Sequence, residues 1–162
     1  PVALPSIPEV KMVMVESAVE MLSALEDSLD EQDADYLIMT AAVADYQPVK
    51  KANQKLKKKD KELQLTLKKT PDILRDIAKI KKKQLVIGFA LETENEKENA
   101  YEKMKKKNLD AIILNSLKDK GAGFGKDTNK ITLLTPTEER SYDLKSKELV
   151  AEDILNFIEE CV

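Results

Sequence analysis

The chain lacks histidine and tryptophan entirely, and it has a single cysteine, Cys161, beside its C-terminus. Without histidine it cannot form a Ser-His-Asp triad, a Cys-His pair or a histidine metal site. With one cysteine it cannot form an internal disulfide. Nothing beside Cys161 in the sequence would activate its thiol, so we interpret this residue as a bystander rather than a nucleophile.

Glycine is also scarce, and all the glycines lie at positions 88, 121, 123 and 125. No stretch between a predicted strand and a helix therefore resembles the Gly-x-Gly-x-x-Gly fingerprint or a phosphate-binding P-loop. The run from Gly121 to Gly125 precedes a predicted strand, not a helix. We interpret it as a flexible connection, which is also the kind of loop that can close over a ligand.

Long apolar runs and a strong net charge are absent too. No segment approaches the roughly 20 apolar residues that a membrane span needs, and no signal peptide is recognisable, so we expect a cytoplasmic protein without membrane contact. Charged residues make up 35% of the chain but cancel to a net charge of −3, so no overall field favours nucleic acid. At 162 residues, without an internal repeat or a linker, the chain is predicted to be one domain.

Strand-like and helix-like patterns alternate along the chain. Short apolar runs predict buried strands, and strict alternation predicts a half-exposed one at residues 62–67. Amphipathic spacing, together with start signals at Ser17 and at Thr70-Pro71-Asp72, predicts helices. The predicted strands cover residues 11–15, 36–40, 62–67, 84–90 and 111–115, with a hairpin made by residues 131–134 and a strand near Tyr142. The predicted helices cover residues 17–29 and 95–107 and begin again at residues 70 and 146. The pattern predicts an α/β fold: a three-layer, Rossmann-like, mostly parallel sheet with a mixed hairpin edge.

The most informative stretch follows the predicted strand at residues 36–40. Thr40, Ala41 and Ala42 are small, and they follow a parallel strand at its carboxyl end, where open α/β folds bind ligands. Asp45 comes three residues later. By itself Asp45 is open to several roles: it could cap a turn, pair with a lysine, hold a ribose hydroxyl or act near Mg²⁺.

Lysines are concentrated in the predicted polar loop at residues 47–61 and just after it. They occupy positions 50, 51, 55, 57, 58, 59, 61, 68 and 69. A solvated loop is the simplest interpretation. The functional alternative is a phosphate clamp, because a lysine ammonium is a compact charge on a flexible stem. A nucleic-acid arm is less well supported, since no aromatic residue lies between Tyr46 and Phe89 to stack on bases.

A second pair of lysines lies on the predicted helix at residues 95–107. Lys103 and Lys107 stand four residues apart and therefore share one face of that helix. They either keep the surface soluble or reach a ligand at the ends of the strands.

Taken in order, these segments resemble the phosphopantothenate–cysteine ligase family, especially the ligase half of bacterial bifunctional coenzyme A biosynthesis proteins. The resemblance covers nearly the whole chain, and five motifs in one order are far more specific than any single motif. The matching pieces are Ala41–Tyr46 (AAVADY), Lys55–Lys58 (KLKK), Thr70–Leu74 (TPDIL), Gly88–Thr93 (GFALET), Lys103–Asp110 (KMKKKNLD), and Asn115 with the later Gly-Phe and Asp-x-Asn elements.

The resemblance implies a two-step ligase reaction. The carboxylate of 4′-phosphopantothenate attacks the α-phosphate of CTP, giving an acyl-cytidylate and pyrophosphate. The amine of L-cysteine then displaces CMP and forms the amide. Mg²⁺ is the implied cofactor and CTP the co-substrate; no FMN is expected, and the implied assembly is a homodimer.

The resemblance also implies which residues form the site. Lys55 is the catalytic lysine, and Asp45 is a possible ligand of the metal, whose site is otherwise unknown. The implied nucleotide-binding residues are Thr40, Ala41, Ala42, Asp45, Lys55, Pro71, Asp72, Ile73, Leu74, Phe89, Lys103 and Lys107. Backbone groups around Pro71 and Phe89 are expected to read the base, because few side chains there can do so.

The family pattern includes an earlier part that does not precede Pro1 in this sequence. It contains a strand ending in a Gly-Gly-Thr turn and an asparagine used in amide formation. We therefore expect residues 1–162 to be the C-terminal portion of a single nucleotide-binding ligase domain, incomplete and poorly active alone. The strands at residues 11–15 and 36–40 are expected to lack their common neighbour.

Two other functions remain open from the residues themselves. The Lys50–Lys69 segment could form a polyanion-binding module. Alternatively, Leu63, Leu65 and Leu67 could pair across a two-fold axis, which would make the chain a dimerisation fragment without activity.

Overall fold

The computed structural model describes residues 7–31, 34–50, 52, 54, 63–116, 118–119, 121–122 and 125–161. The chain divides into two compact units. The first unit comprises Pro1–Gln32 and Val43–Ile73, and the second comprises Asp33–Ala42 and Leu74–Val162. The prediction of one domain over residues 1–162 stays a prediction.

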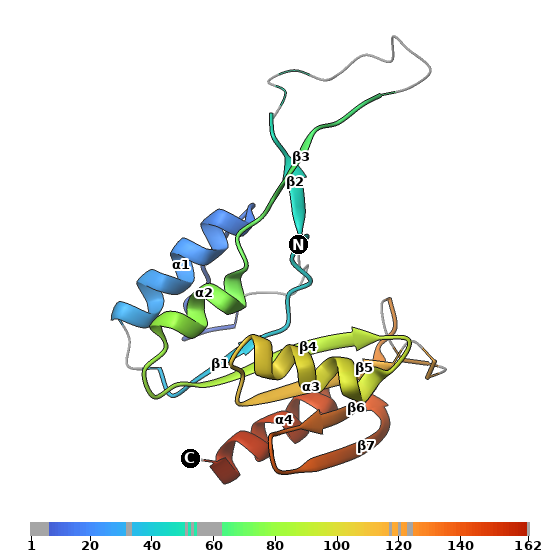
Figure 1. Ribbon diagram of the computed structural model, residues 1–162. Helices are drawn as coiled ribbons and strands as arrows, with labels where there is room; N and C mark the ends of the chain where they lie inside the picture. The colour runs from blue at the N-terminus through green and yellow to red at the C-terminus, as the bar shows by residue number, and fades with distance from the viewer. Residues whose placement is uncertain are drawn as a thin grey trace. The chain divides into compact units, whose positions relative to one another are not determined.

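The second unit contains a five-stranded sheet (Figure 1). Its strands, in spatial order, are β1 (Tyr36–Met39), β4 (Leu85–Glu92), β5 (Ala111–Ser116), β6 (Thr128–Leu134) and β7 (Glu139–Ser146). The first three strands run parallel, while β6 and β7 form the antiparallel edge. The α/β prediction, with a mixed and mostly parallel sheet and a hairpin edge, is therefore confirmed.

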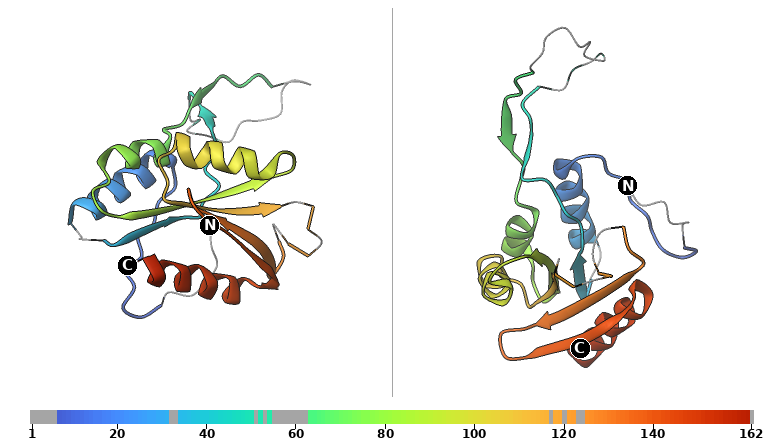
Figure 2. Two further views of the ribbon diagram at one scale, coloured as in Figure 1. Left: turned by 60° about the horizontal axis from the view of Figure 1, so that its bottom comes forward. Right: turned by 90° about the vertical axis from the view of Figure 1, so that its right-hand side faces the viewer.

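Helices cover both faces of this sheet, as Figure 2 shows: α3 (Glu96–Lys106) lies on one face and α4 (Lys147–Cys161) on the other. Two groups of buried side chains match these layers. Ile87 and Ile113 join α4 residues such as Phe157 in one core. Val86 and Ile112 join α3 residues such as Met104 in the other. Because β4 and β5 are buried on both faces, their sequences are continuously apolar, as buried parallel strands require.

Close packing on the α3 side explains one of the glycines. A Cβ added at Gly88 in β4 would lie 2.6 Å from Leu109 Cδ1, which precedes β5. Helix α2 (Ile73–Ile80) contributes Leu74 to the same core. Glycine therefore lets Leu109 approach the strand backbone closely.

In the first unit, α1 (Ala18–Glu31) begins with a reciprocal pair of cap hydrogen bonds. Ser17 Oγ accepts from the Glu20 backbone N–H at 3.2 Å, and Glu20 Oε2 accepts from the Ser17 N–H at 3.1 Å. This is the Ser-x-x-Glu capping box, and it confirms the helix predicted from Ser17. The unit also contains an antiparallel pair, β2 (Tyr46–Pro48) and β3 (Leu67–Lys69).

Two strand predictions in this unit are wrong. Residues 11–15 are exposed and form no strand, and β3 starts at Leu67, so the described residues 63–66 are not strand either. The strand β2 was not predicted, because its three residues include a proline and sit inside a polar segment. Alternating side chains indicate which face a strand would bury, but a strand also needs a hydrogen-bonded neighbour, which a local pattern cannot supply.

Candidate functional site

Strand register places the predicted ligand-binding edge of the second unit. In the parallel pair β1–β4, Met39 lies opposite Gly88, so β1 ends where β4 reaches its middle. Strand β4 continues through Phe89 to Glu92, paired on its other side with β5. Thr40 therefore leaves β1 at the level of Phe89. The carboxyl ends of parallel strands are where open α/β sheets bind ligands.

The helix α3 adds a cation at this level. Lys103 Nζ donates a 2.8 Å hydrogen bond to the backbone carbonyl oxygen of Phe89. Lys107 follows directly after α3, and its backbone N–H donates to the Lys103 carbonyl at 2.9 Å. Both side chains are half-buried. The structure thus brings together two of the predicted site residues, Phe89 and Lys103, and places Lys107 one helical turn beyond Lys103.

In the first unit, two further predicted segments meet. Thr70 Oγ1 donates to the Ala44 carbonyl at 2.5 Å, and the Thr70 backbone N–H donates to the Asp45 carbonyl at 2.9 Å. Asp45 is thereby held beside the turn that leads through Pro71 into α2. Thr70 was predicted to cap that helix with Pro71 as its first residue, but α2 begins at Ile73 and the Thr70 hydroxyl bonds to Ala44 instead.

The predicted site residues are distributed over both units. Asp45, Pro71, Asp72 and Ile73 belong to the first unit. Thr40, Ala41, Ala42, Leu74, Phe89, Lys103 and Lys107 belong to the second. Lys55, the predicted catalytic residue, lies outside the described residues, as do all of residues 55–62 in the middle of the lysine-rich segment. A single nucleotide pocket made by all of them stays a prediction.

Mg²⁺ stays a predicted cofactor, and the described residues offer one candidate carboxylate for it, Asp45. The described residues contain no cluster of three or more acidic, cysteine or histidine side chains able to hold a metal. Asp45 is exposed, with its side-chain carboxylate accessible. Mg²⁺ commonly binds through one or two carboxylates, with substrate phosphates and water completing its shell. Asp45 can supply such a carboxylate.

One polar pair near the strand ends was not predicted. Asn129 Nδ2 donates to Asn115 Oδ1 at 3.2 Å, linking β6 to the end of β5. Asn115 and the Asp127-Thr128-Asn129 element both appear in the sequence motifs, but the sequence assigned no role to either asparagine. The only sequence signal was their position, with Asn115 at the end of one predicted strand and Asn129 just before the next.

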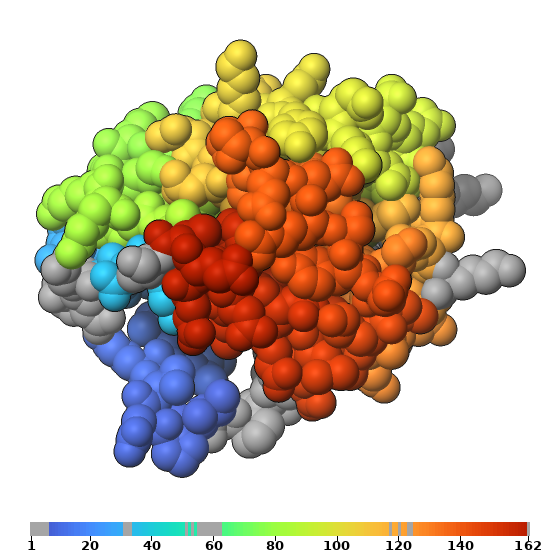
Figure 3. Space-filling model, turned by 90° about the horizontal axis from the view of Figure 1, so that it is seen from below, coloured from blue at the N-terminus to red at the C-terminus, as the bar shows by residue number. Residues whose placement is uncertain are grey.

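A shallow groove lies elsewhere in the second unit, between β7 and α4, whose residues pack side by side in Figure 3. Its volume is about 420 Å³, and it is lined by Arg140, Ser141, Tyr142, Asp153, Asn156, Phe157 and Glu160. None of these residues was predicted to form a site.

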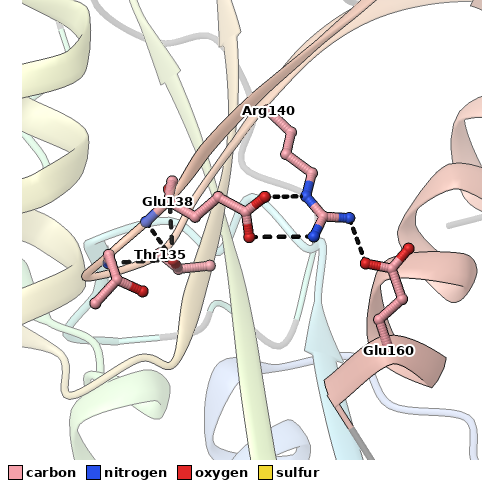
Figure 4. A network of polar contacts seen from close by, with 5 residues as sticks. Thr135, Glu138, Arg140 and Glu160 are labelled. Atoms are coloured by element: carbon pink, nitrogen blue, oxygen red, sulfur yellow. Dashed lines mark hydrogen bonds and ion pairs between the residues drawn. The ribbon is translucent and has the colours of Figure 1, made fainter.

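Arg140 closes one side of the groove with ion pairs (Figure 4). Its guanidinium makes a two-point ion pair with Glu138, and its Nη1 lies 2.6 Å from Glu160 Oε2. The hydrogen bonds that Arg140 donates to these two carboxylates raise the pKa of Arg140, and the bond to Glu138 lowers the pKa of Glu138. Because its charge is neutralised twice, Arg140 joins β7 to α4 rather than offering a binding site for an anion.

No helix among the described residues has the length and apolar character that crossing a membrane would require.

Curated relatives match the chain over most of its length. It is 45% identical over 161 residues to a cysteine/cysteine sulfinic acid decarboxylase from an unknown prokaryotic organism, covering 98% of this chain and 44% of that protein. It is 40% identical over 149 residues to the coenzyme A biosynthesis bifunctional protein CoaBC of Bacillus subtilis (strain 168), covering 91% of this chain and 36% of that protein. The chain thus spans less than half the length of these relatives.

A solved structure agrees with this similarity. The crystal structure of the C-terminal domain of a coenzyme A biosynthesis bifunctional protein CoaBC superimposes with a TM-score of 0.77 at 39% identity, covering 99% of this chain and 72% of that one. The model of the family described as the DNA/pantothenate metabolism flavoprotein C-terminal domain matches residues 1–162. The chain therefore belongs to this family and corresponds to the phosphopantothenoylcysteine synthetase half of CoaBC proteins.

Proposed function

We propose that the chain is the ligase part of a coenzyme A biosynthesis protein, joining 4′-phosphopantothenate to L-cysteine at the expense of CTP. The similarity to the CoaBC C-terminal domain supports the pathway. The observation that carries the site is the Lys103–Phe89 hydrogen bond, which holds a cation in the second unit at the level where β1 ends beside β4. Such an enzyme would act in the cytoplasm.

The proposed reaction forms one C–N bond in two displacements. A carboxylate oxygen of 4′-phosphopantothenate attacks the α-phosphorus of CTP, and pyrophosphate leaves. The cysteine amine then attacks the acyl carbon, CMP leaves with the bonding electron pair, and the amine loses its proton. Negative charge grows on the phosphates in the first step, and fixed cations stabilise such charge most where water is excluded.

Each predicted residue has a proposed role. Thr40, Ala41 and Ala42 let the nucleotide approach the backbone, and Phe89 offers its backbone to the base. Lys103, Lys107 and Lys55 neutralise phosphate charge, with Lys55 the residue expected to act on the reacting phosphate. When bound, Mg²⁺ supplies further charge neutralisation on the phosphates, with Asp45 as its protein ligand.

We also propose that the active form is a homodimer joined through the segment that contains β3. Leu63, Leu65 and Leu67 alternate along this segment and are 70%, 58% and 51% exposed. Pairing across a two-fold axis would bury them. Light scattering should give twice the chain mass, and Leu65→Lys should return the monomer.

The relative named as a cysteine/cysteine sulfinic acid decarboxylase favours a second candidate. In that case the chain would be part of a protein that releases CO₂ from cysteine. The two candidates differ in their requirement for nucleotide, because decarboxylation consumes none.

The test is turnover by the intact protein that carries this chain. With 4′-phosphopantothenate, L-cysteine, CTP and Mg²⁺, we expect CMP and pyrophosphate in equal amounts. Without 4′-phosphopantothenate we expect neither product. Release of CO₂ from cysteine without CTP, together with no CMP, would favour the decarboxylase. Affinity for RNA that falls steeply with salt, again without CMP, would favour a polyanion-binding module.

A further inference from the structure

A pair of carboxamides, one buried and one half-buried, lies where β5 and β6 reach the predicted ligand-binding edge of the sheet. Asn129 is only 8% exposed. Its Nδ2 donates to Asn115 Oδ1 at 3.2 Å, and its own Oδ1 accepts from the Lys130 backbone N–H at 3.0 Å. Asn129 is therefore fixed as a donor toward Asn115, because its acceptor oxygen is already engaged with the backbone.

Register places Asn115 on the same face of the sheet as the Phe89 side chain. Asn115 lies opposite Leu91 of β4 and opposite Ile131 of β6. Side chains alternate along a strand, so Asn115 shares the face of Ile113, which lies in the core beneath α4. Phe89 packs against that same core. The asparagine pair thus ends this core at the level where β4 and β5 finish.

Hydrogen-bond accounting shows which part of Asn115 is available. Its Oδ1 accepts from Asn129, and this bond fixes the orientation of the carboxamide. Its Nδ2 carries two N–H donors, and no described residue accepts from them. A half-buried Asn115 at this edge therefore presents donors without an acceptor inside the described part of the protein.

We propose that Asn115 binds a hydrogen-bond-accepting oxygen of a ligase substrate through Nδ2, and that Asn129 positions it; this rests on the proposed function. A pair of neutral N–H donors suits a carbonyl oxygen, present both in the cytosine ring of CTP and in the amide of 4′-phosphopantothenate. It does not suit the ammonium group of cysteine, which also donates, and the carboxylate of cysteine pairs more strongly with a charged donor than with a neutral amide. The ligand of Asn115 is thus either CTP or 4′-phosphopantothenate, and the measurements below distinguish these two substrates.

The competing explanation is purely structural. In it, the side-chain amides of Asn115 and Asn129 only hydrogen-bond to each other at the end of the core, and neither contacts a ligand. The two explanations differ for Asn129→Asp. This change replaces the donor with an acceptor, so the Asn115 amide must turn over and offer its oxygen outward. The substrate would then lose its donors, although Asn115 itself is unchanged. Asn115→Asp removes the same donors directly.

The experiment measures KM for CTP and for 4′-phosphopantothenate separately in the intact protein. We expect Asn115→Asp and Asn129→Asp to raise the KM of the same one substrate by about 10-fold or more, the value of one lost hydrogen bond, with a smaller change in kcat. Asn156→Asp makes the same chemical change on α4, and Ile131→Val loosens the core beside Asn115 without a polar change. Both controls should leave KM unaltered.

Two results would overturn the proposal. One is an unaltered KM for both substrates in Asn115→Asp together with a lowered melting temperature, which is the structural outcome. The other comes from side-chain amide NMR signals. If CTP shifts the Phe89 backbone amide but neither substrate shifts the Asn115 side-chain amide, the proposed function stands and this proposal fails. If nothing shifts with either substrate, both fail.

Discussion

Lys103 Nζ donates a 2.8 Å hydrogen bond to the backbone carbonyl of Phe89, and this contact joins α3 to β4 where the sheet is expected to bind its ligand. The lysine lies fourteen positions after Phe89, on the next element of the chain. A lysine ammonium carries three N–H donors and commonly binds phosphate oxygens, so we expect the same group to contact the nucleotide.

Replacement of this lysine tests its role in nucleotide binding. Lys103→Ala should weaken CTP binding about 10- to 100-fold, because a hydrogen bond to a charged group contributes about 1.5–3 kcal/mol. Lys105→Ala, an exposed lysine of the same helix, should bind CTP as the unchanged protein does. Isothermal titration calorimetry provides the comparison. Equal affinity in the two variants would remove Lys103 from the site.

A second contact at the opposite end of β4 should contribute to stability. Asp110 Oδ2 accepts from the Val86 backbone N–H and from Lys81 Nζ, each at 2.7 Å. Asp110→Ala leaves the amide of a buried strand residue without its acceptor, so unfolding free energy should fall by about 1–3 kcal/mol. Denaturant titration measures this loss.

The matched variant Asp110→Asn separates the two partners. Its amide oxygen can still accept from Val86, but the charge that pairs with Lys81 is gone. It should therefore recover more than half of the stability lost in Asp110→Ala. If both variants lose the same amount, the ion pair rather than the strand amide is the source of the effect.

Much of the second unit could be predicted from sequence because its signals are local. The apolar runs at residues 36–40, 84–90 and 111–115 match β1, β4 and β5 within two residues at either end. Such runs indicate strands buried on both faces, which require no knowledge of distant residues. Ser146 likewise precedes α4, and its Oγ accepts from the Leu149 N–H at 3.3 Å.

The contacts that sequence reasoning missed depend on residues far apart in the chain. Arg140 and Glu160 are separated by 20 positions, and Asn115 and Asn129 by 14. No periodicity connects such residues, so only the folded register brings them together. The incorrect strand at residues 11–15 has the same origin, because the short apolar run was present but a paired neighbour among the described residues was not.

The Thr70 hydroxyl should stabilise the arrangement around Asp45. Thr70→Val removes the donor to the Ala44 carbonyl while keeping the side-chain shape. We expect a loss of about 0.5–1 kcal/mol, the lower part of the usual range, because this bond is exposed to solvent. Hydrogen exchange of the Thr70 amide, which donates to Asp45, should also accelerate. Thr66→Val should change neither quantity, and equal effects of the two variants would contradict this account.

The ion pair between Glu138 and Arg140 gives a pH-dependent prediction. The hydrogen bond from Arg140 lowers the pKa of Glu138 below the ordinary value of 4.5. Glu138 therefore contributes stability above its unfolded-state pKa, and that contribution is lost as the pH falls through the folded-state pKa. Glu138→Gln should be less stable than the unchanged protein at about pH 7, and the difference should vanish in acid.

Thermal unfolding at a series of pH values measures this difference. Glu159→Gln, on the exposed side of α4, serves as the control and should show no such trend. A stability difference that widens as the pH falls would contradict the assigned role of Glu138.

The most direct test of the nucleotide site predicted from Lys55, Asp45 and Phe89 is the rise in melting temperature on adding Mg²⁺ with CTP or with ATP. We predict a larger rise with CTP, the loss of that difference in Lys55→Ala, and its retention in Lys68→Ala, which removes the same charge from β3. An equal response to both nucleotides would contradict the base preference. A Lys55→Ala protein that responds as the unchanged protein does would contradict the site itself.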